Sequence, residues 1–178
     1  LALALDQKSV GFKPKVFEQD SAKRDDPRVA DPVLKEGALL TKVFNRLARS
    51  CFYEAQKNFE GYMPLGRVSK EVLKKVYNVM CAYEETMYRV ELHSIMSQMD
   101  EFIRYANKYW SSHIKEADQE GSEELRRQTL IDSFYLLRIA TLLMHPIVPR
   151  GTEKICDFMN FDFDEFFSWN YDFDSMEE

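Results

Sequence analysis

The chain has 178 residues, of which 45% are hydrophobic and 30% charged, and its formal net charge at pH 7 is −6. This length suits one domain with at most an appendage, and the composition is ordinary for a globular protein in water. The longest apolar run, at 139–144, is far shorter than the roughly 18 residues that a membrane span needs, so we expect no membrane segment.

The three cysteines, Cys51, Cys81 and Cys156, are odd in number and far apart, and the three histidines are equally scattered. This spacing fits neither a disulfide framework nor a zinc site. We therefore expect reduced cysteines in a cytoplasmic protein and no metal site.

The acidic charge is concentrated at the end of the chain. Residues 157–178 contain eight Asp and Glu residues and neither Lys nor Arg. The rest of the chain has 22 acids and 24 bases, so its net charge is weakly positive. A weakly basic body with an acidic tail is compatible with RNA binding but does not require it.

Residues 1–31 lack sustained periodicity, and we interpret them as an extended lead-in to a helical bundle over 32–160. Asp31 followed by Pro32 is a good helix start, and the first helix should end at about Phe59, before Gly61. Its apolar stripe leaves Asn45 and Arg49 together on the opposite, solvent-facing side.

Two further helices follow in the pattern. Ser69 can cap the second helix. The third helix should begin near Glu91, after an interruption at 89–90. The alternative is one bent helix from 69 to about 114. We interpret the segment 117–121 as a polar connection between the third helix and the next one.

The central helix follows that connection. Ser122 can cap it, acidic residues occupy its first turn, and it must stop near His145 because Pro146 disfavours helix in the residue before it. It is apolar on most of its circumference, as expected for a helix at the centre of a bundle. After a corner at Pro149, Thr152 can cap a short helix to about Asn160.

Four main helices and a short fifth, joined by short to medium links, predict an all-α antiparallel helix bundle. Seven apolar residues should share one core: Phe44, Leu47, Phe102, Ile103, Leu130, Phe134 and Leu137.

The end of the central helix and the corner after it resemble a known family. The pattern comprises Leu136, Leu137, Arg138, Leu142, Leu143, Pro146, Pro149, Glu153, Lys154 and Ile155. It is similar to the last core helix of the anticodon-binding domain in class Ia aminoacyl-tRNA synthetases, and most similar to the methionyl-tRNA synthetases. The resemblance covers roughly 33–170 and implies a C-terminal anticodon-binding bundle.

Asn45 and Arg49 are the leading candidates for RNA contact. They lie one helical turn apart, and their side chains can read base edges or pair with phosphate. The first helix resembles the family's first anticodon-domain helix, in which Asn-x-x-x-Arg contacts anticodon bases. Lys42 lies on the same side. On spacing alone, the simpler interpretation is a polar pair on a solvated helix face, and it is the resemblance that favours RNA contact.

Asn107-Lys108-Tyr109 matches a second family element, Asn-x-Tyr. In methionyl enzymes a Pro-Trp follows, and its Trp stacks on an anticodon base. That pair is absent here, and the nearby rings are Trp110 and His113, which we include as candidates. Trp110 also extends the apolar stripe of its helix, so core packing is the alternative.

The two signatures by which class I synthetases bind ATP, His-Ile-Gly-His and Lys-Met-Ser-Lys-Ser, are absent from the 178 residues. We therefore expect no catalytic residue and no cofactor in this chain, with ATP bound by the catalytic domain of a longer protein. That domain and a tRNA anticodon loop are the implied partners.

The segment 161–178 is acidic and rich in aromatic residues, and we expect it to pack on the bundle or on a neighbouring domain. Two alternatives remain open. One is a helical protein-interaction module whose acidic aromatic tail docks to a partner. The other is the same type of domain from another class I synthetase.

Overall fold

The computed structural model describes residues 39–169, except for the side chains of Leu40, Thr41 and His93. Over this range the chain forms helices and no strand. A π-helical turn, η1 (Leu39–Phe44), leads into α4 (Asn45–Asn58). The following helices are α5 (Lys70–Tyr88), α6 (Leu92–Glu120), α7 (Glu123–Met144), α8 (Pro149–Met159) and α9 (Phe163–Phe167).

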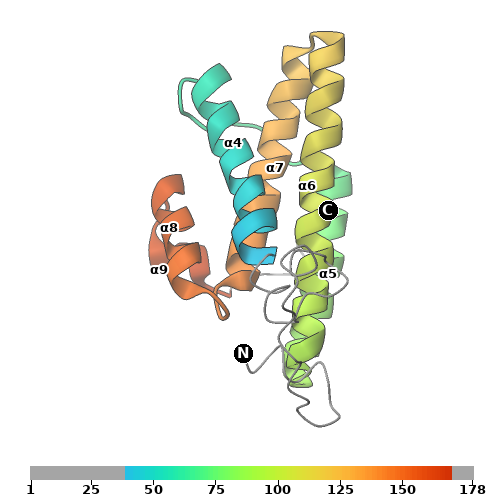
Figure 1. Cartoon of the computed structure of the whole chain (residues 1–178), viewed down its shortest axis with the longest axis vertical. Coiled ribbons are helices and arrows are strands. Elements are labelled where there is room, and N and C mark those ends of the chain that lie inside the picture. The colour runs from blue at the N-terminus through green and yellow to red at the C-terminus, as the bar shows by residue number, and fades with distance from the viewer. Residues whose placement is uncertain (1–38, 170–178) are drawn as a thin grey trace, which may run out of the picture.

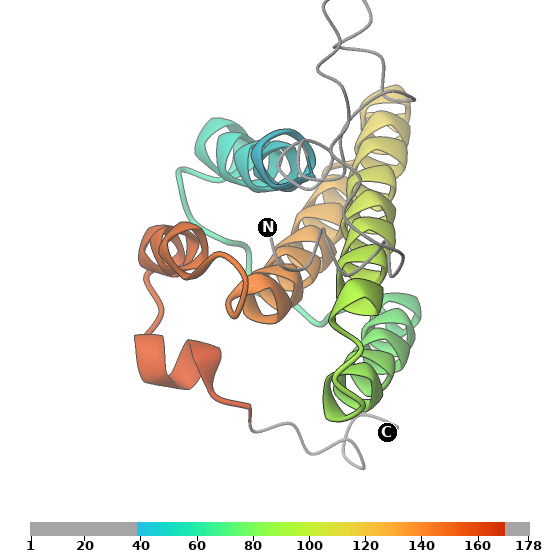
Figure 2. The same cartoon turned by 60° about the horizontal axis from the view of Figure 1, so that its bottom comes forward.

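The prediction of an all-α bundle is confirmed. Figure 1 shows α6 and α7 as the long antiparallel pair at its centre, with α4 beside α7 and α5 behind α6. The α8 and α9 helices lie at one side, next to α4 and the end of α7. Figure 2 shows the same arrangement nearly end-on, with α5 and α4 on different sides of the central pair. The predicted start of the first helix, near Pro32, lies outside the described residues.

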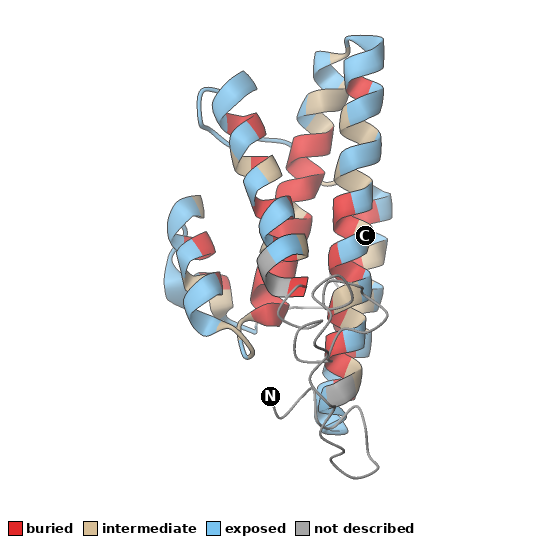
Figure 3. Cartoon of the chain, viewed as in Figure 1, coloured by how far each residue is buried: buried red, intermediate tan, exposed pale blue. Residues whose placement is uncertain are grey.

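The central helix α7 begins and ends as predicted. The Ser122 hydroxyl accepts a hydrogen bond from the N–H of Leu125 at 3.2 Å, which satisfies one of the free donors of the first turn. From Thr129 to Met144 almost every α7 side chain is buried, as the red ribbon in Figure 3 shows. All seven residues predicted to share one core do so.

Two boundaries differ from the sequence prediction, and one additional helix is present. The α6 helix continues through the polar segment to Glu120, where Gly121 takes a left-handed conformation (φ +62°) that closes the helix at little steric cost. The α8 helix begins at Pro149, so Thr152 lies inside it and does not cap it. A short helix, α9, also forms in the acidic aromatic segment, and the Asp162 carboxylate caps it by accepting from the N–H of Glu165 at 3.0 Å.

The interruption predicted near residue 90 is present, so the alternative of one long bent helix is wrong. Val90 adopts φ +59°, a left-handed conformation that is unusual for a β-branched residue. This turn lets α5 and α6 pack side by side in opposite directions.

A buried carboxylate joins three of the helices. Asp132 on α7 is 0% exposed. Its oxygens accept hydrogen bonds from the Ser69 N–H at 2.8 Å, the Ser69 hydroxyl at 2.6 Å and the Tyr109 hydroxyl at 2.8 Å. Gln128, one turn earlier on α7, also donates to it at 3.2 Å. The carboxylate therefore fixes the start of α5 and the middle of α6 against α7.

An ion pair holds α4 against α7. Arg126 of α7 lies 2.6 Å from Glu54 of α4, whose side chain is nearly buried, and also pairs with Asp118 of α6. Removing Arg126 would leave a nearly buried carboxylate without its cation, which costs more than breaking an exposed pair. Arg126 therefore ties together α4, α6 and α7.

Two variants test the core. Phe134 is only 4% exposed, and Phe134→Ala should lower the free energy of unfolding by about 3–5 kcal/mol, because it removes a large buried side chain and leaves a cavity. Urea unfolding followed by circular dichroism measures this loss. Phe163→Ala, at a ring that is 46% exposed, is the control and should cost much less. Equal losses would show that Phe134 is not a core residue.

Tyr109→Phe tests the carboxylate network. It keeps the ring and removes one hydrogen bond to a charged acceptor, so the free energy of unfolding should fall by about 1.5–3 kcal/mol at pH 7. Burial, followed by the hydrogen bond to Asp132, raises the pKa of Tyr109 above its usual value. The native state thus holds this proton more tightly than the unfolded chain. Its contribution is fully present below about pH 10 and is lost as the pH rises further. Unfolding titrations between pH 8 and 11 should show a shallower loss of stability in Tyr109→Phe than in the unsubstituted chain, and parallel curves would contradict the assignment.

Candidate nucleic-acid interface

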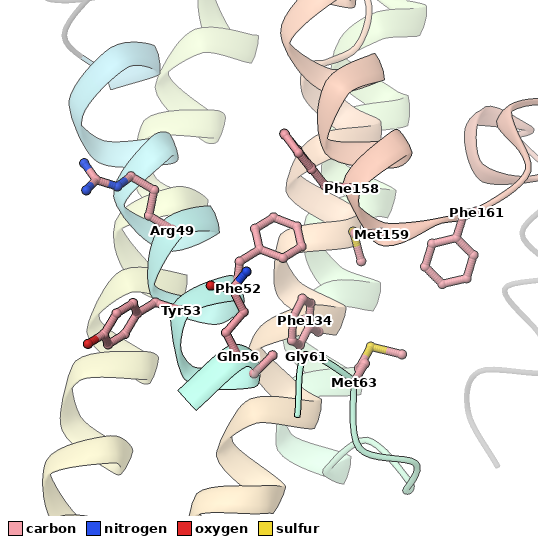
Figure 4. Close-up of a pocket in the computed structure, with 11 residues that line it drawn as sticks. Arg49, Phe52, Tyr53, Gln56, Gly61, Met63, Phe134, Phe158, Met159 and Phe161 are labelled. Carbon is pink, nitrogen blue, oxygen red and sulfur yellow. The ribbon is translucent and has the colours of Figure 1, made fainter. Parts of the chain in front are cut away.

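The outer face of α4 carries the residues singled out from the sequence. Lys42, Asn45 and Arg49 are all exposed on η1 and α4. Together they line a shallow hollow of about 570 Å³, whose remaining lining residues are Arg46, Ser50 and Tyr53. Figure 4 shows the side chains of Arg49 and Tyr53 extending from this outer side of α4. Three cations and no acid line the hollow, so it suits an anionic ligand.

Arg46 was not a candidate from the sequence, yet the structure places it at the centre of this face. Its Nε donates to the Asn107 side-chain oxygen at 3.2 Å. The Asn107 amide in turn donates to the carbonyls of Val43 at 3.0 Å and Ile103 at 2.9 Å. Asn107 is nearly buried, so it is a rigid support that links α6 to α4 and orients the Arg46 guanidinium. This role of Arg46 could not be predicted from the spacing of residues, because it depends on the contact between α4 and α6, which are far apart in the sequence.

A second hollow lies between α4 and α6 and continues from the first. It has a volume of about 510 Å³ and shares Arg46 and Ser50 with the hollow on α4. Its other lining residues come from α6 and are Arg104, Asn107, Lys108, Trp110 and Ser111. The charge of Arg104 is already paired with Asp100 at 2.9 Å, so Arg46 and Lys108 are the cations least engaged with acids here.

The position of Trp110 is compatible with both roles considered from the sequence. It is half-buried and packs against the core, while part of it lines the hollow between α4 and α6. A ring held by the core on one side can offer a flat surface to a base on the other. The structure therefore brings Trp110 next to the α4 face by way of Arg46 and Ser50.

His113 is placed differently. Its ring lies on that of Tyr109, with centroids 4.1 Å apart, and its Nδ1 is 2.8 Å from the Tyr109 carbonyl oxygen. It lines neither of the two hollows. The structure thus groups Lys42, Asn45, Arg49 and Trp110 but leaves His113 on a different part of α6.

No group of three or more His, Cys, Asp or Glu residues within 39–169 is arranged to hold a metal ion. Among the described helices, none is long and apolar enough to cross a membrane. Cys51, Cys81 and Cys156 are all free thiols, and burial raises the pKa of Cys51 far above its usual value. A thiol in that state is unreactive.

The chain matches no profile of a known protein family. It is similar to curated methionine–tRNA ligases over about half of its length. The identity is 31% over 93 residues with the protein of Ignicoccus hospitalis, covering 51% of this chain and 16% of the relative. The identity with the protein of Bacillus cereus is 28% over 104 residues, covering 56% of this chain and 18% of the relative. The chain thus spans less than a fifth of the length of these relatives.

A solved structure shows the same fold. The methionyl-tRNA synthetase of Mycobacterium tuberculosis, crystallised in its free state, superposes with a TM-score of 0.61 at 22% identity. The superposition covers 71% of this chain and 27% of the synthetase. Sequence similarity and fold agree with the resemblance found in the helix and corner around Pro146. The chain therefore contains a methionyl-tRNA-synthetase-like helical domain.

Proposed function

We propose that the domain recognises a tRNA anticodon loop through the outer face of α4, as the non-catalytic domain of a methionyl-tRNA-synthetase-like ligase in the cytoplasm. The observation that carries this proposal is the hollow lined by Lys42, Asn45, Arg46 and Arg49 without an acidic residue. The chain as a whole is acidic, so this local concentration of positive charge needs a reason.

The chemistry of the face suits unstacked nucleotides. Asn45 and Arg49 are one helical turn apart on a rigid helix, so they can engage neighbouring bases or the phosphate between them. Within residues 39–169, the Arg49 side chain makes neither a hydrogen bond nor an ion pair, so its guanidinium gives up no such contact with these residues on binding. Trp110 supplies an aromatic surface at the adjoining hollow.

The domain performs no chemistry in this proposal. Amino-acid activation and ATP binding belong to a catalytic domain in the same ligase, and the helical bundle contributes the position of the tRNA. A rigid support matters here because a base contact loses its selectivity when its side chain can swing away. Asn107 gives Arg46 that support.

Arg49→Ala should weaken the binding of a methionine-accepting anticodon stem-loop by about 5- to 150-fold, because one base or stacking contact is worth about 1–3 kcal/mol. Fluorescence titration at low and moderate salt measures this change, since phosphate contacts fade as salt rises. Arg89→Ala is the matched control. It removes the same side chain from an exposed site in the α5–α6 turn, outside both hollows, and should leave the affinity unchanged.

Two outcomes would alter the proposal. Equal affinity of the unsubstituted chain and Arg49→Ala would remove the α4 face as the recognition surface. A stronger preference for the stem-loop of another amino acid would keep the surface and change the tRNA identity. Circular dichroism of each variant separates lost contacts from lost structure.

A further inference from the structure

A third hollow opens on the other side of α4, between α4 and α8, with α7 as its floor (Figure 4). Its volume is about 450 Å³, in the range of small-ligand sites. Its walls are mostly aromatic and thioether side chains: Phe52, Met63, Phe134, Phe158, Met159 and Phe161. Arg49, Gln56 and Tyr53 lie along its α4 edge.

The aromatic rings at this hollow are unusually open to water. Phe158 on α8 is 74% exposed, although its ring centroid is only 6.0 Å from that of Phe52. Tyr53 is 67% exposed, and Met63 and Phe161 are also exposed. Large apolar side chains gathered around an open cavity mark a surface that binds something. A flat apolar group would cover more of this surface than water does.

The hollow is continuous with the basic face already described. It shares Arg49 and Tyr53 with the hollow on α4, which in turn shares Arg46 and Ser50 with the hollow between α4 and α6. None of the described residues that line these three hollows is acidic. They therefore form one track across α4 that is cationic in the middle and aromatic at both ends, with Trp110 at one end and Phe158 at the other.

Such a track complements a strand that alternates anionic groups with flat apolar rings. We propose that the α4–α8 hollow takes one unstacked base of the RNA strand that lies on the α4 face. This inference rests on the proposed function and adds to it a base-binding site that includes α8. The base lies against the rings of Phe52 and Phe158, where stacking does not require a particular base.

The polar side chains at the edge have distinct tasks in this arrangement. Figure 4 shows the Arg49 guanidinium directed away from Phe158 and out of the hollow, so it contacts the part of the strand on the α4 face and not the inserted base. Gln56 is one of the two uncharged polar side chains at the edge, and its amide offers both a donor and an acceptor. Gln56 therefore gives the site its preference among bases, whereas the rings give it affinity.

Phe158→Ala tests the inference. The variant should bind a methionine-accepting anticodon stem-loop about 5- to 150-fold more weakly than the unsubstituted 178-residue chain, because it removes a stacking surface. Tyr88→Ala is the control, since Tyr88 is an aromatic residue that is 90% exposed on α5 and lines none of the three hollows. It should leave the affinity unchanged.

A set of stem-loops from which one loop base at a time has been removed identifies the inserted base. At one loop position, removing the base should weaken binding to the unsubstituted chain by the same factor as Phe158→Ala weakens it. Removing that same base should cause no further loss of affinity in Phe158→Ala. Gln56→Ala should lower the discrimination between bases at that same position. It also provides a second, exposed variant that leaves the rings in place.

The results separate this inference from the function on which it rests. If Arg49→Ala weakens binding and Phe158→Ala does not, the α4–α8 hollow is not a base site, although the α4 face still binds RNA. If the unsubstituted chain binds no RNA, both proposals are wrong. If Phe158→Ala changes only the oligomeric state in sedimentation, the hollow is a contact between copies of the chain, which also overturns the inference.

Discussion

The bundle depends on one buried carboxylate. Asp132 has no cation beside it among the described residues, and its charge is stabilised by donors from Ser69, Tyr109 and Gln128. A buried charge held only by hydrogen bonds tolerates little movement, because each lost donor leaves a polar group without a partner in a medium where that is costly. The three helices that supply these groups are therefore fixed in register as well as in contact.

This register carries through to the RNA-binding face proposed above. Tyr109 and Asn107 are two residues apart on α6 and point to different neighbours. The tyrosine meets α7, and the asparagine meets η1 and α4. Fixing the rotation of α6 at Tyr109 thus fixes where the Asn107 amide stands, and with it the Arg46 guanidinium. The Asn-x-Tyr element that resembles the synthetase family works in this chain as a link between the core and the α4 surface.

The fold was predictable from local rules to a large extent. Ser122, Pro146 and the apolar pattern between them define α7, because caps, proline and burial act within a few residues of each other. Errors arose where a longer-range contact decides. The polar segment before Gly121 continues α6, and its Asp118 pairs with Arg126 of α7, a contact that no periodicity reveals.

The candidate site, like the fold, could be predicted from the sequence only in part. The exposure of Asn45 and Arg49 follows from helix geometry, so the sequence was enough. The placements of Arg46 and Trp110 follow from how α4 meets α6, which depends on Asn107. The α4–α8 hollow depends on the corner at Pro149, which brings Phe158 opposite Phe52. Contacts between residues so far apart in the sequence cannot be predicted from residue spacing.

The acidic aromatic segment shows why net charge is a poor guide to this surface. Its described part packs against the end of α7 and against α5: Phe167 stacks on His145 at 3.9 Å, and the Trp169 ring lies 6.1 Å from that of Tyr83. None of the carboxylates in this described part lines the α4 hollow, and at physiological salt the field of an exposed carboxylate is largely screened beyond about 8 Å. An RNA bound at the α4 face as proposed would meet three cations, and neutralising about three phosphates would give a salt slope near −2 for a single strand. With so shallow a slope, charge would attract and orient the RNA in the proposed complex, and base contacts and stacking would supply most of the selectivity.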